Sequence, residues 1–320
     1  LGIVGVNLLY AAFYFRDKPQ LLLKSLLDNL STERVEIDMA EFSGNEFKHV
    51  DNRAVSLKLV QLGLSGAAMF GPSGDVLQPS EVLRKKPVLV ERGSFRPVTK
   101  VNIDIIDCAL KQFSADLAVA PDGVVELMEI NLRQLMVNGT VDLGDFLARA
   151  DLLEATGKTV LISDYFEYYR LATYLARYTS EPIAVAMGVP SLMDLFEEEH
   201  YSDLDGGILE AFGKLFTKNM RIYVYPYRDP TSGVLETADT VTIPDEQRNI
   251  FEHLVERGRI KAIRNFDESI LHIFSRDVLQ RIKDGDTLWE TMVPQEITAI
   301  IKAHRLFGYR ADEANAARPV

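Results

Sequence analysis

The order of apolar runs and helical segments is the feature that most constrains this fold. Short runs rich in β-branched and apolar residues alternate with longer segments in which apolar residues recur at helical spacing. This alternation is typical of a parallel sheet whose strands are joined by helices. Strands are predicted at 34–40, 66–70, 87–91, 124–130, 159–163, 183–187 and 221–225. Helices are predicted near 18–30, 52–63, 101–115, 143–156, 165–179, 191–199 and 205–217, and the chain after 225 is predicted to be helical to near 307.

The turn Gly71-Pro72-Ser73-Gly74 and the segment up to residue 86 mark the predicted domain boundary. We therefore expect an N-terminal α/β region over 1–86 and a larger α/β domain with a helical C-terminal part over 87–320. Residues 1–15 are nearly uncharged but fall short of the ~20 residues that cross a bilayer, so they predict a buried strand running into a helix and no membrane partner. Since the chain begins with Leu inside this apolar segment, we expect further sequence upstream.

Composition excludes a general nucleic-acid binder. The chain has 35 Lys and Arg against 47 Asp and Glu, a formal net charge of −12, whereas binding a duplex requires a basic surface. The single cysteine, Cys108, has no partner for an internal disulfide, which favours a reducing cytoplasm. The five histidines show no metal-ligand spacing, and no metal site is predicted.

Residues 93–99 follow a predicted strand and lead into a predicted helix. In open parallel sheets ligands bind at the carboxyl ends of strands, so this loop is the first candidate site. Its glycine, hydroxyls and cations, together with the amides of the next helix, form a candidate phosphate cradle. An ordinary strand-to-helix turn, with Thr99 as the helix cap, explains the same residues and stays open.

The same segment resembles the signature of the nicotinate-mononucleotide adenylyltransferases, Gly-[Gly/Ser/Thr]-Phe-[Asp/Asn]-Pro-x-His-x-Gly-His. The residues that agree with it are Gly93, Ser94, Phe95, Pro97 and Val98. The residues that depart from it are Arg96, in place of the acid or amide, and Thr99 and Asn102, in place of the two histidines.

Two further segments resemble this family in the correct order. Residues 187–195 are similar to its Gly-x-Asp-Ser-Leu-x-x-Leu loop, with matches at Gly188, Ser191, Leu192 and Leu195 and with Pro190 in place of the Asp. Residues 274–279 occupy the place of its Ile-Ser-x-Thr-x-Ile-Arg motif, with Arg276 and Leu279 in place of the Thr and the Arg. Residues 281–307 are similar to the family's ending.

The resemblance, which spans roughly 88–308, implies a Rossmann-like nucleotidyltransferase fold with helices on both faces of a parallel sheet. It implies a cytoplasmic protein of NAD biosynthesis that joins ATP, carried with Mg²⁺, to nicotinate or nicotinamide mononucleotide. Arg96 and Lys100 could supply the charge of the missing second histidine and act on the reacting phosphates. Nucleotides would be held by Gly93, Ser94, Phe95, Thr99, Gly188, Ser191, Ser275 and Arg276. With Arg281, these cations predict one small basic pocket at the strand ends.

The missing histidines leave a second function open. A catalytically silent descendant of the fold would serve as a ligand sensor, a scaffold or a self-assembling subunit, so homo-oligomers are also expected. Whether the chain is an enzyme is not decided by these residues. The whole chain also resembles a larger bacterial family named after the adenylyltransferase resemblance, in which a further N-terminal portion precedes Leu1.

The segment from Asp164 to Arg170 is a second candidate site. Its tyrosines could stack on a base and its carboxylates could bind ribose hydroxyls or a metal. Alternatively, Asp164 and Glu167 form a capping pair and the tyrosines form the buried face of a helix. The sequence leaves both interpretations open.

Overall fold

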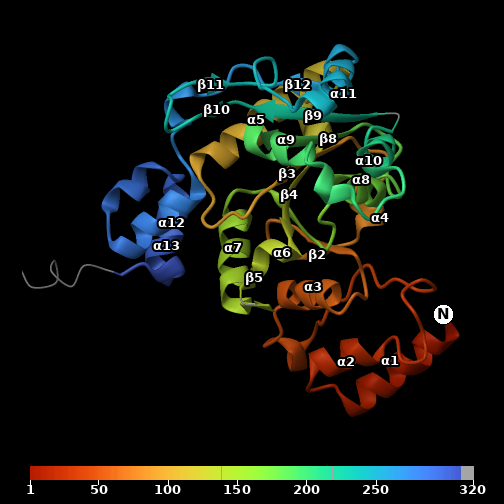
Figure 1. The fold of residues 1–320 in the computed structure, drawn as a ribbon. Helices are drawn as coiled ribbons and strands as arrows, with labels where there is room; N and C mark the ends of the chain where they lie inside the picture. The colour runs from red at the N-terminus through yellow and green to blue at the C-terminus, as the bar shows by residue number, and fades with distance from the viewer. Residues whose placement is uncertain (138, 218, 311–320) are drawn as a thin grey trace, which may run out of the picture.

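One eight-stranded sheet forms the centre of the computed structural model, which describes residues 1–137, 139–217 and 219–310 (Figure 1). Its strands, in spatial order, are β12 (Ile260–Ala262), β9 (Met220–Tyr225), β8 (Ile183–Gly188), β3 (Val88–Arg92), β4 (Val125–Asn131), β7 (Thr159–Ser163), β1 (Ala67–Phe70) and β2 (Val76–Leu77). The first six are mutually parallel, whereas β1 is antiparallel to both β7 and β2. This confirms the predicted Rossmann-like α/β fold.

Helices cover both faces of this sheet. Their bounds are α1 (Gly2–Tyr14), α2 (Pro19–Ser25), α3 (Asn52–Gln61), α4 (Pro79–Val82), α5 (Lys100–Leu117), α6 (Leu132–Leu135), α7 (Leu143–Ala155), α8 (Tyr168–Leu175), α9 (Val189–Leu195), α10 (Gly207–Leu215), α11 (Asp245–Glu256), α12 (Ser275–Asp284) and α13 (Gln295–His304). Short 3₁₀ helices lie at Asn45–Phe47, Pro121–Gly123, Glu198–Tyr201, Glu268–Ile270, Thr287–Thr291 and Leu306–Gly308.

The strands build two cores because successive side chains point to opposite faces. In β3, Leu89 packs with α5, α7 and the C-terminal helices α12 and α13, whereas Val88 and Val90 pack with α8, α9, α10 and α11. Both faces of the central strands are therefore apolar, which is why they appear in the sequence as near-continuous hydrophobic runs. Val90 pairs with Leu127 of β4 on one side and with Val185 of β8 on the other.

The strand order reverses direction at β3. After β3, the chain adds β4 and β7 on one side, and then crosses over to add β8, β9 and β12 on the other side. In sheets of this kind the crevice at the carboxyl ends of the two strands flanking the reversal is the usual ligand site. For this chain that crevice lies beyond the ends of β3 and β8.

The N-terminal part differs from the prediction in three ways. The segment 1–15 is the helix α1, with Phe13 81% exposed, rather than a buried strand leading into a helix. Residues 34–40 form no strand, although the amide of Ile37 donates to Leu64 O. The predicted boundary at residue 86 falls within the region that completes the sheet, because β1 and β2 belong to it. Across the described residues, no helix has both the length and the apolar character needed to span a bilayer.

The C-terminal part is less helical than predicted. A hairpin of β10 (Tyr227–Arg228) and β11 (Leu235–Glu236) follows β9, and β12 then joins the sheet edge after α11. Another small hairpin pairs β5 (Met136–Val137) with β6 (Thr140–Val141). In Figure 1, α12 and α13 stand to one side of the sheet, beyond α7.

Candidate functional site

A buried charge network joins the carboxyl ends of three adjacent strands. Arg92, the last residue of β3, donates from Nη2 to Glu129 Oε1 of β4 at 2.9 Å, and Nε lies 2.5 Å from Oε2. Ser163, the last residue of β7, donates its hydroxyl to the same carboxylate. The side chain of Glu129 is fully buried and that of Arg92 is 9% exposed. Burying such a pair is costly unless every group is satisfied, and here the carboxylate has three donors.

Arg92 is also tied to the loop after β7. Nη2 donates to Tyr165 O at 2.7 Å, Nη1 donates to Phe166 O, and the guanidinium lies 4.4 Å from the ring centroid of Tyr168. Burial lowers the pKa of Arg92, but Glu129, Tyr168 and Glu167 together raise it by more, so the side chain stays charged. Arg92 therefore holds the loop against the end of the sheet, and its side chain also lines the adjacent pocket.

That pocket, called here the strand-end pocket, encloses about 170 Å³ beside the β3–β8 crevice. Its lining residues are Arg92, Gln134, Phe166, Glu167, Tyr168, Ser191, Asp194, Leu195, His200 and Tyr201. It combines aromatic rings with two carboxylates and several neutral hydrogen-bonding groups. Its volume is below the ~300 Å³ typical of sites that enclose a whole small molecule. The pocket therefore suits one ring system, with the rest of a ligand at the mouth.

The polar groups around the pocket are partly engaged. Glu167 forms an ion pair with Arg170, with Oε2 3.1 Å from Nε. The hydroxyl of Tyr201 donates to Leu195 O at 2.7 Å. Burial raises the pKa of Tyr168, so its hydroxyl is neutral and able to donate. The exposed carboxylate of Asp194 lies at the rim of the pocket.

Packing explains why the loop after β3 begins with Gly93 and carries Phe95 two residues later. Phe95 turns inward with φ 46° and is 1% exposed, and its ring lies directly against Gly93. A Cβ on Gly93 would be 2.7 Å from Phe95 Cε1, so glycine is needed for this close approach. The Ser94 carbonyl accepts from Arg149 Nη1 at 2.9 Å. The loop is thus folded onto α7.

The alternative interpretation of Thr99 as a helix cap is confirmed. Thr99 and Asn102 form a capping box at the start of α5, and Thr99 N donates to Asn102 Oδ1 at 3.0 Å. The amide of Lys100 donates to Met292 O at 3.0 Å. These are the amides that a phosphate at this helix would use. A phosphate-binding role for Gly93, Ser94, Phe95 and Thr99 stays a prediction, and it requires some of these bonds to open.

The predicted phosphate-binding cations are dispersed. Arg96 Nε forms an ion pair with Asp145 Oδ1 at 2.6 Å, and Asp145 also pairs with the buried Arg149. Lys100 is exposed at the start of α5. Arg276 is exposed on α12, and Arg281 pairs with Asp286. None of these four residues is among the described residues that line the strand-end pocket, where the lining cation is Arg92, and a basic pocket formed by them stays a prediction.

The two later motif segments, 187–195 and 274–279, lie on different helices. Gly188 is the N-cap of α9, and Ser191, within that helix, lines the strand-end pocket. Ser275 begins α12, beside Phe274, whose ring contacts that of Tyr227 at 5.9 Å. Ser275 and Arg276 are not among the described residues that line the pocket. Of the three motif regions, the second thus contributes Ser191 to the described lining of the strand-end pocket, and neither 93–99 nor 274–279 contributes a residue to it.

The second candidate segment takes part in both packing and the pocket. The predicted capping pair is wrong, since α8 begins at Tyr168 with Glu167 as an N-cap that makes no side-chain cap bond, and Asp164 is exposed. Tyr165 packs against Tyr174 with ring centroids 5.2 Å apart. Phe166, Glu167 and Tyr168 line the strand-end pocket.

Sequence reasoning missed Arg92, Glu129 and Glu91. A signal was present, because Glu129 interrupts a buried apolar strand and a charge there needs a partner. Glu91 is 2% exposed and accepts a hydrogen bond from Asn102 Nδ2 at 2.8 Å. Asn102, which replaces the second motif histidine, is therefore directed at a buried carboxyl.

No group of three or more His, Cys, Asp or Glu side chains among the described residues could hold a metal ion. The expectation that Mg²⁺ would come with ATP stays a prediction.

No family model and no curated protein matches this chain. Among solved structures it is similar to the nicotinic acid mononucleotide adenylyltransferase of Plasmodium falciparum, complexed with APC or with NaAD. Both likenesses have a TM-score of 0.40 and 11% identity, and they cover 70% of this chain and 98% of the other. The structures thus bear out the resemblance to this family that the sequence showed. The assignment of the fold rests on the strand order described above.

Proposed function

We propose that this chain binds the nucleoside part of a nucleotide in the strand-end pocket and does not transfer an adenylyl group. The pocket itself is the observation that carries the proposal. Phe166 and Tyr168 offer flat surfaces for a heteroaromatic ring, and Asp194 at the rim offers acceptors for ribose hydroxyls. Because Glu129 neutralises Arg92, the pocket favours an uncharged or cationic ring over a phosphate.

The placement of the cations supports binding without transfer. Moving an adenylyl group requires fixed positive charge at the reacting phosphates, since catalysis of this reaction is mainly alignment and charge stabilisation. Arg96 is held by Asp145, and Arg276 lies outside the lining of the pocket. Thr99 and Asn102, at the two histidine positions, bond to each other. This favours the second function predicted from the sequence, a ligand sensor.

Calorimetric titration with adenosine, AMP and nicotinate mononucleotide tests the binding. Ligand at about 100 times its dissociation constant should add about 2.7 kcal/mol to the free energy of unfolding, which also raises Tm. Asp194→Ala should weaken binding by about tenfold, because a charged hydrogen bond is worth about 1.5–3 kcal/mol. The matched control is Glu197→Gln, an exposed charge in the same segment outside the pocket lining.

An assay with MgATP and nicotinate mononucleotide tests the absence of transfer. We expect no dinucleotide from folded protein at ligand concentrations that saturate the pocket. Dinucleotide formation would contradict the sensor function. Failure of all three ligands to bind, or equal losses in Asp194→Ala and Glu197→Gln, would contradict the strand-end pocket as the site.

A further inference from the structure

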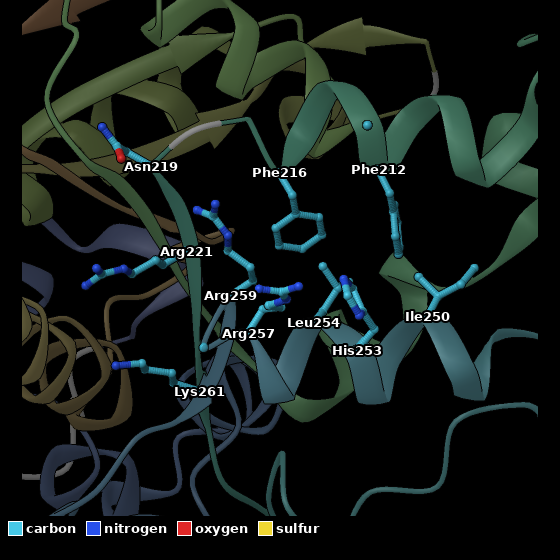
Figure 2. Close-up of a pocket in the computed structure, with 12 residues that line it drawn as sticks. Phe212, Phe216, Asn219, Arg221, Ile250, His253, Leu254, Arg257, Arg259 and Lys261 are labelled. Atoms are coloured by element: carbon cyan, nitrogen blue, oxygen red, sulfur yellow. The ribbon is translucent and has the colours of Figure 1, made fainter.

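A second, larger pocket of about 780 Å³ lies at the opposite end of the sheet (Figure 2). It opens where β9 and β12 begin, between α10 and α11, and we call it the basic groove. Arg221 stands at the start of β9, and Arg259 directly precedes β12. The strand-end pocket lies instead at the carboxyl ends of the strands, so the two pockets are separate.

The basic groove is positively charged within an acidic protein. Its lining includes Arg221, Arg257, Arg259 and Lys261, and none of the described residues that line it is Asp or Glu. One carboxylate nearby offsets part of this charge, since Asp116 Oδ2 lies 2.7 Å from Lys261 Nζ and 3.7 Å from Arg221 Nη1. With a formal net charge of −12 over the whole chain, such a gathering of cations concentrates a local field that attracts anions.

The chain turn after α11 places two of these arginines. Gly258 adopts φ 63°, and the amide of Arg259 returns to Leu254 O at 2.8 Å, so the helix ends and the chain turns directly into β12. Arg257 and Arg259 flank this glycine. Arg259 Nη1 donates to Met220 O at 3.3 Å, which ties its side chain to the start of β9.

The opposite side of the groove is aromatic and apolar. Phe216 is partly exposed and packs on Phe212 with ring centroids 5.6 Å apart, and Leu254 lies across from them on α11. In Figure 2 the side chain of Arg257 extends toward the ring of Phe216, and that of Arg259 extends in the direction of Asn219. An apolar surface of this kind beside guanidinium groups suits a ligand with a flat ring and a charged tail.

We propose that the basic groove binds a small phosphate-bearing molecule with an aromatic ring, in chemical class a nucleoside polyphosphate. Arginine binds phosphate oxygens through two parallel N–H groups, and two adjacent arginines can hold successive phosphates of a chain. The ring of the ligand lies on Phe216. The volume of 780 Å³ falls within the range of sites that enclose whole small molecules. This site does not depend on the function proposed for the strand-end pocket.

Titrations with ATP, inorganic triphosphate and adenosine test the proposal. ATP should bind most tightly, adenosine most weakly, and the affinity for ATP should fall as salt concentration rises. The double variant Arg257→Ala with Arg259→Ala should weaken the binding of ATP and of triphosphate by about tenfold or more. The matched control is Arg248→Ala, which removes an exposed arginine of α11 outside the groove lining.

The variant Phe216→Leu separates the ring from the phosphates, because leucine keeps the packing on Phe212 but offers no aromatic face. This variant should weaken the binding of ATP and leave the binding of triphosphate unchanged. Each titration is repeated in the Asp194→Ala chain, where binding at the basic groove persists. The proposal is overturned if the arginine pair and Arg248→Ala behave alike, if Phe216→Leu affects both ligands equally, or if an RNA oligonucleotide outcompetes ATP.

Discussion

At the scale of single residues, the buried carboxyl of Glu91 is the most unusual group in the sheet. One of its oxygens accepts from Asn102, and Oε2 has no hydrogen-bond partner among the described residues. Burial raises the pKa of Glu91 from 4.5 to about 8, which outweighs the lowering by the Asn102 hydrogen bond and by the charge of Lys158. At neutral pH this carboxyl is therefore mostly protonated in the folded protein.

Glu91→Gln tests this protonation. The folded state keeps a proton that the unfolded state releases above pH 4.5, so Glu91 lowers the free energy of unfolding as pH rises from 4.5 to about 8. At about 1.4 kcal/mol per pH unit, the loss reaches the order of 4 kcal/mol. The variant should match the parent near pH 4.5 and exceed it in stability near pH 8. Urea denaturation at both pH values measures this.

The exposed Glu199→Gln, which removes a carboxylate at the surface by the same substitution, is the control. Equal pH dependence of Glu91→Gln and the parent would show that Glu91 ionises normally in the folded protein.

At the scale of elements, α5 shows how one helix start organises the centre of the molecule. Thr99, which is 1% exposed, caps the helix through Asn102, and Asn102 in turn bonds Glu91 of β3. The capping box therefore joins the helix to the strand before it. This explains why the segment resembles a ligand loop in sequence while its polar groups bond to one another.

Thr99→Ala should lower the free energy of unfolding by about 1 kcal/mol, the usual cost of losing a helix cap. Thr99→Ser keeps the hydroxyl that accepts from Asn102 N, so it should retain most of the stability. Thermal unfolding of the three proteins measures the difference. A loss in Thr99→Ser as large as that in Thr99→Ala would assign the effect to the buried methyl group instead of the cap.

At the scale of the whole molecule, Arg53 is a point at which the N-terminal helices join the sheet layers. From the start of α3, Nη1 lies 2.7 Å from both Asp151 Oδ1 and Glu154 Oε1 of α7, and Nη2 pairs with Asp51 at 2.8 Å. These carboxylates raise the pKa of Arg53, so it stays charged at every pH at which the protein is folded. The contact links residues about 100 positions apart in the chain.

Arg53→Ala should lower the free energy of unfolding by about 2 kcal/mol, a value below that of a fully buried pair because solvent screens these groups in part. Arg53→Lys keeps the charge without the forked geometry of the guanidinium, so its free energy of unfolding should lie between those of the parent and of Arg53→Ala. Chemical denaturation measures the loss, with the exposed Arg34→Ala as control. No difference between Arg53→Ala and Arg34→Ala would show that this network does not stabilise the joint.

The sequence predicted the central strands and most helices because their signals are local. The apolar runs at 87–91 and 183–187 lie within a residue of β3 and β8, since burial on both faces leaves an unbroken hydrophobic run. The strand at Ile260–Ala262 was missed because three residues with Lys261 at the centre carry no such run. Its place depends on parallel pairing with β9, which no local pattern encodes.

The candidate site was predicted only in part for the same reason. Ser191 was identified through a motif, and it lines the strand-end pocket. Arg92 and Glu129 were missed because they meet through the register of β3 with β4, across 37 positions of the chain. Arg96 was expected at a phosphate, but its pairing with Asp145 depends on how α7 packs against the loop.

The two outermost strands of the sheet have a consequence for association. β2 is two residues long and β12 three, so each edge offers few unpaired backbone groups to a strand of another molecule. Long, flat edges are the usual starting points of β-aggregation, and a lysine on an edge opposes it further. With Lys261 on one of these short edges, the fold limits edge-to-edge growth into fibrils even though six of its strands are rich in apolar residues.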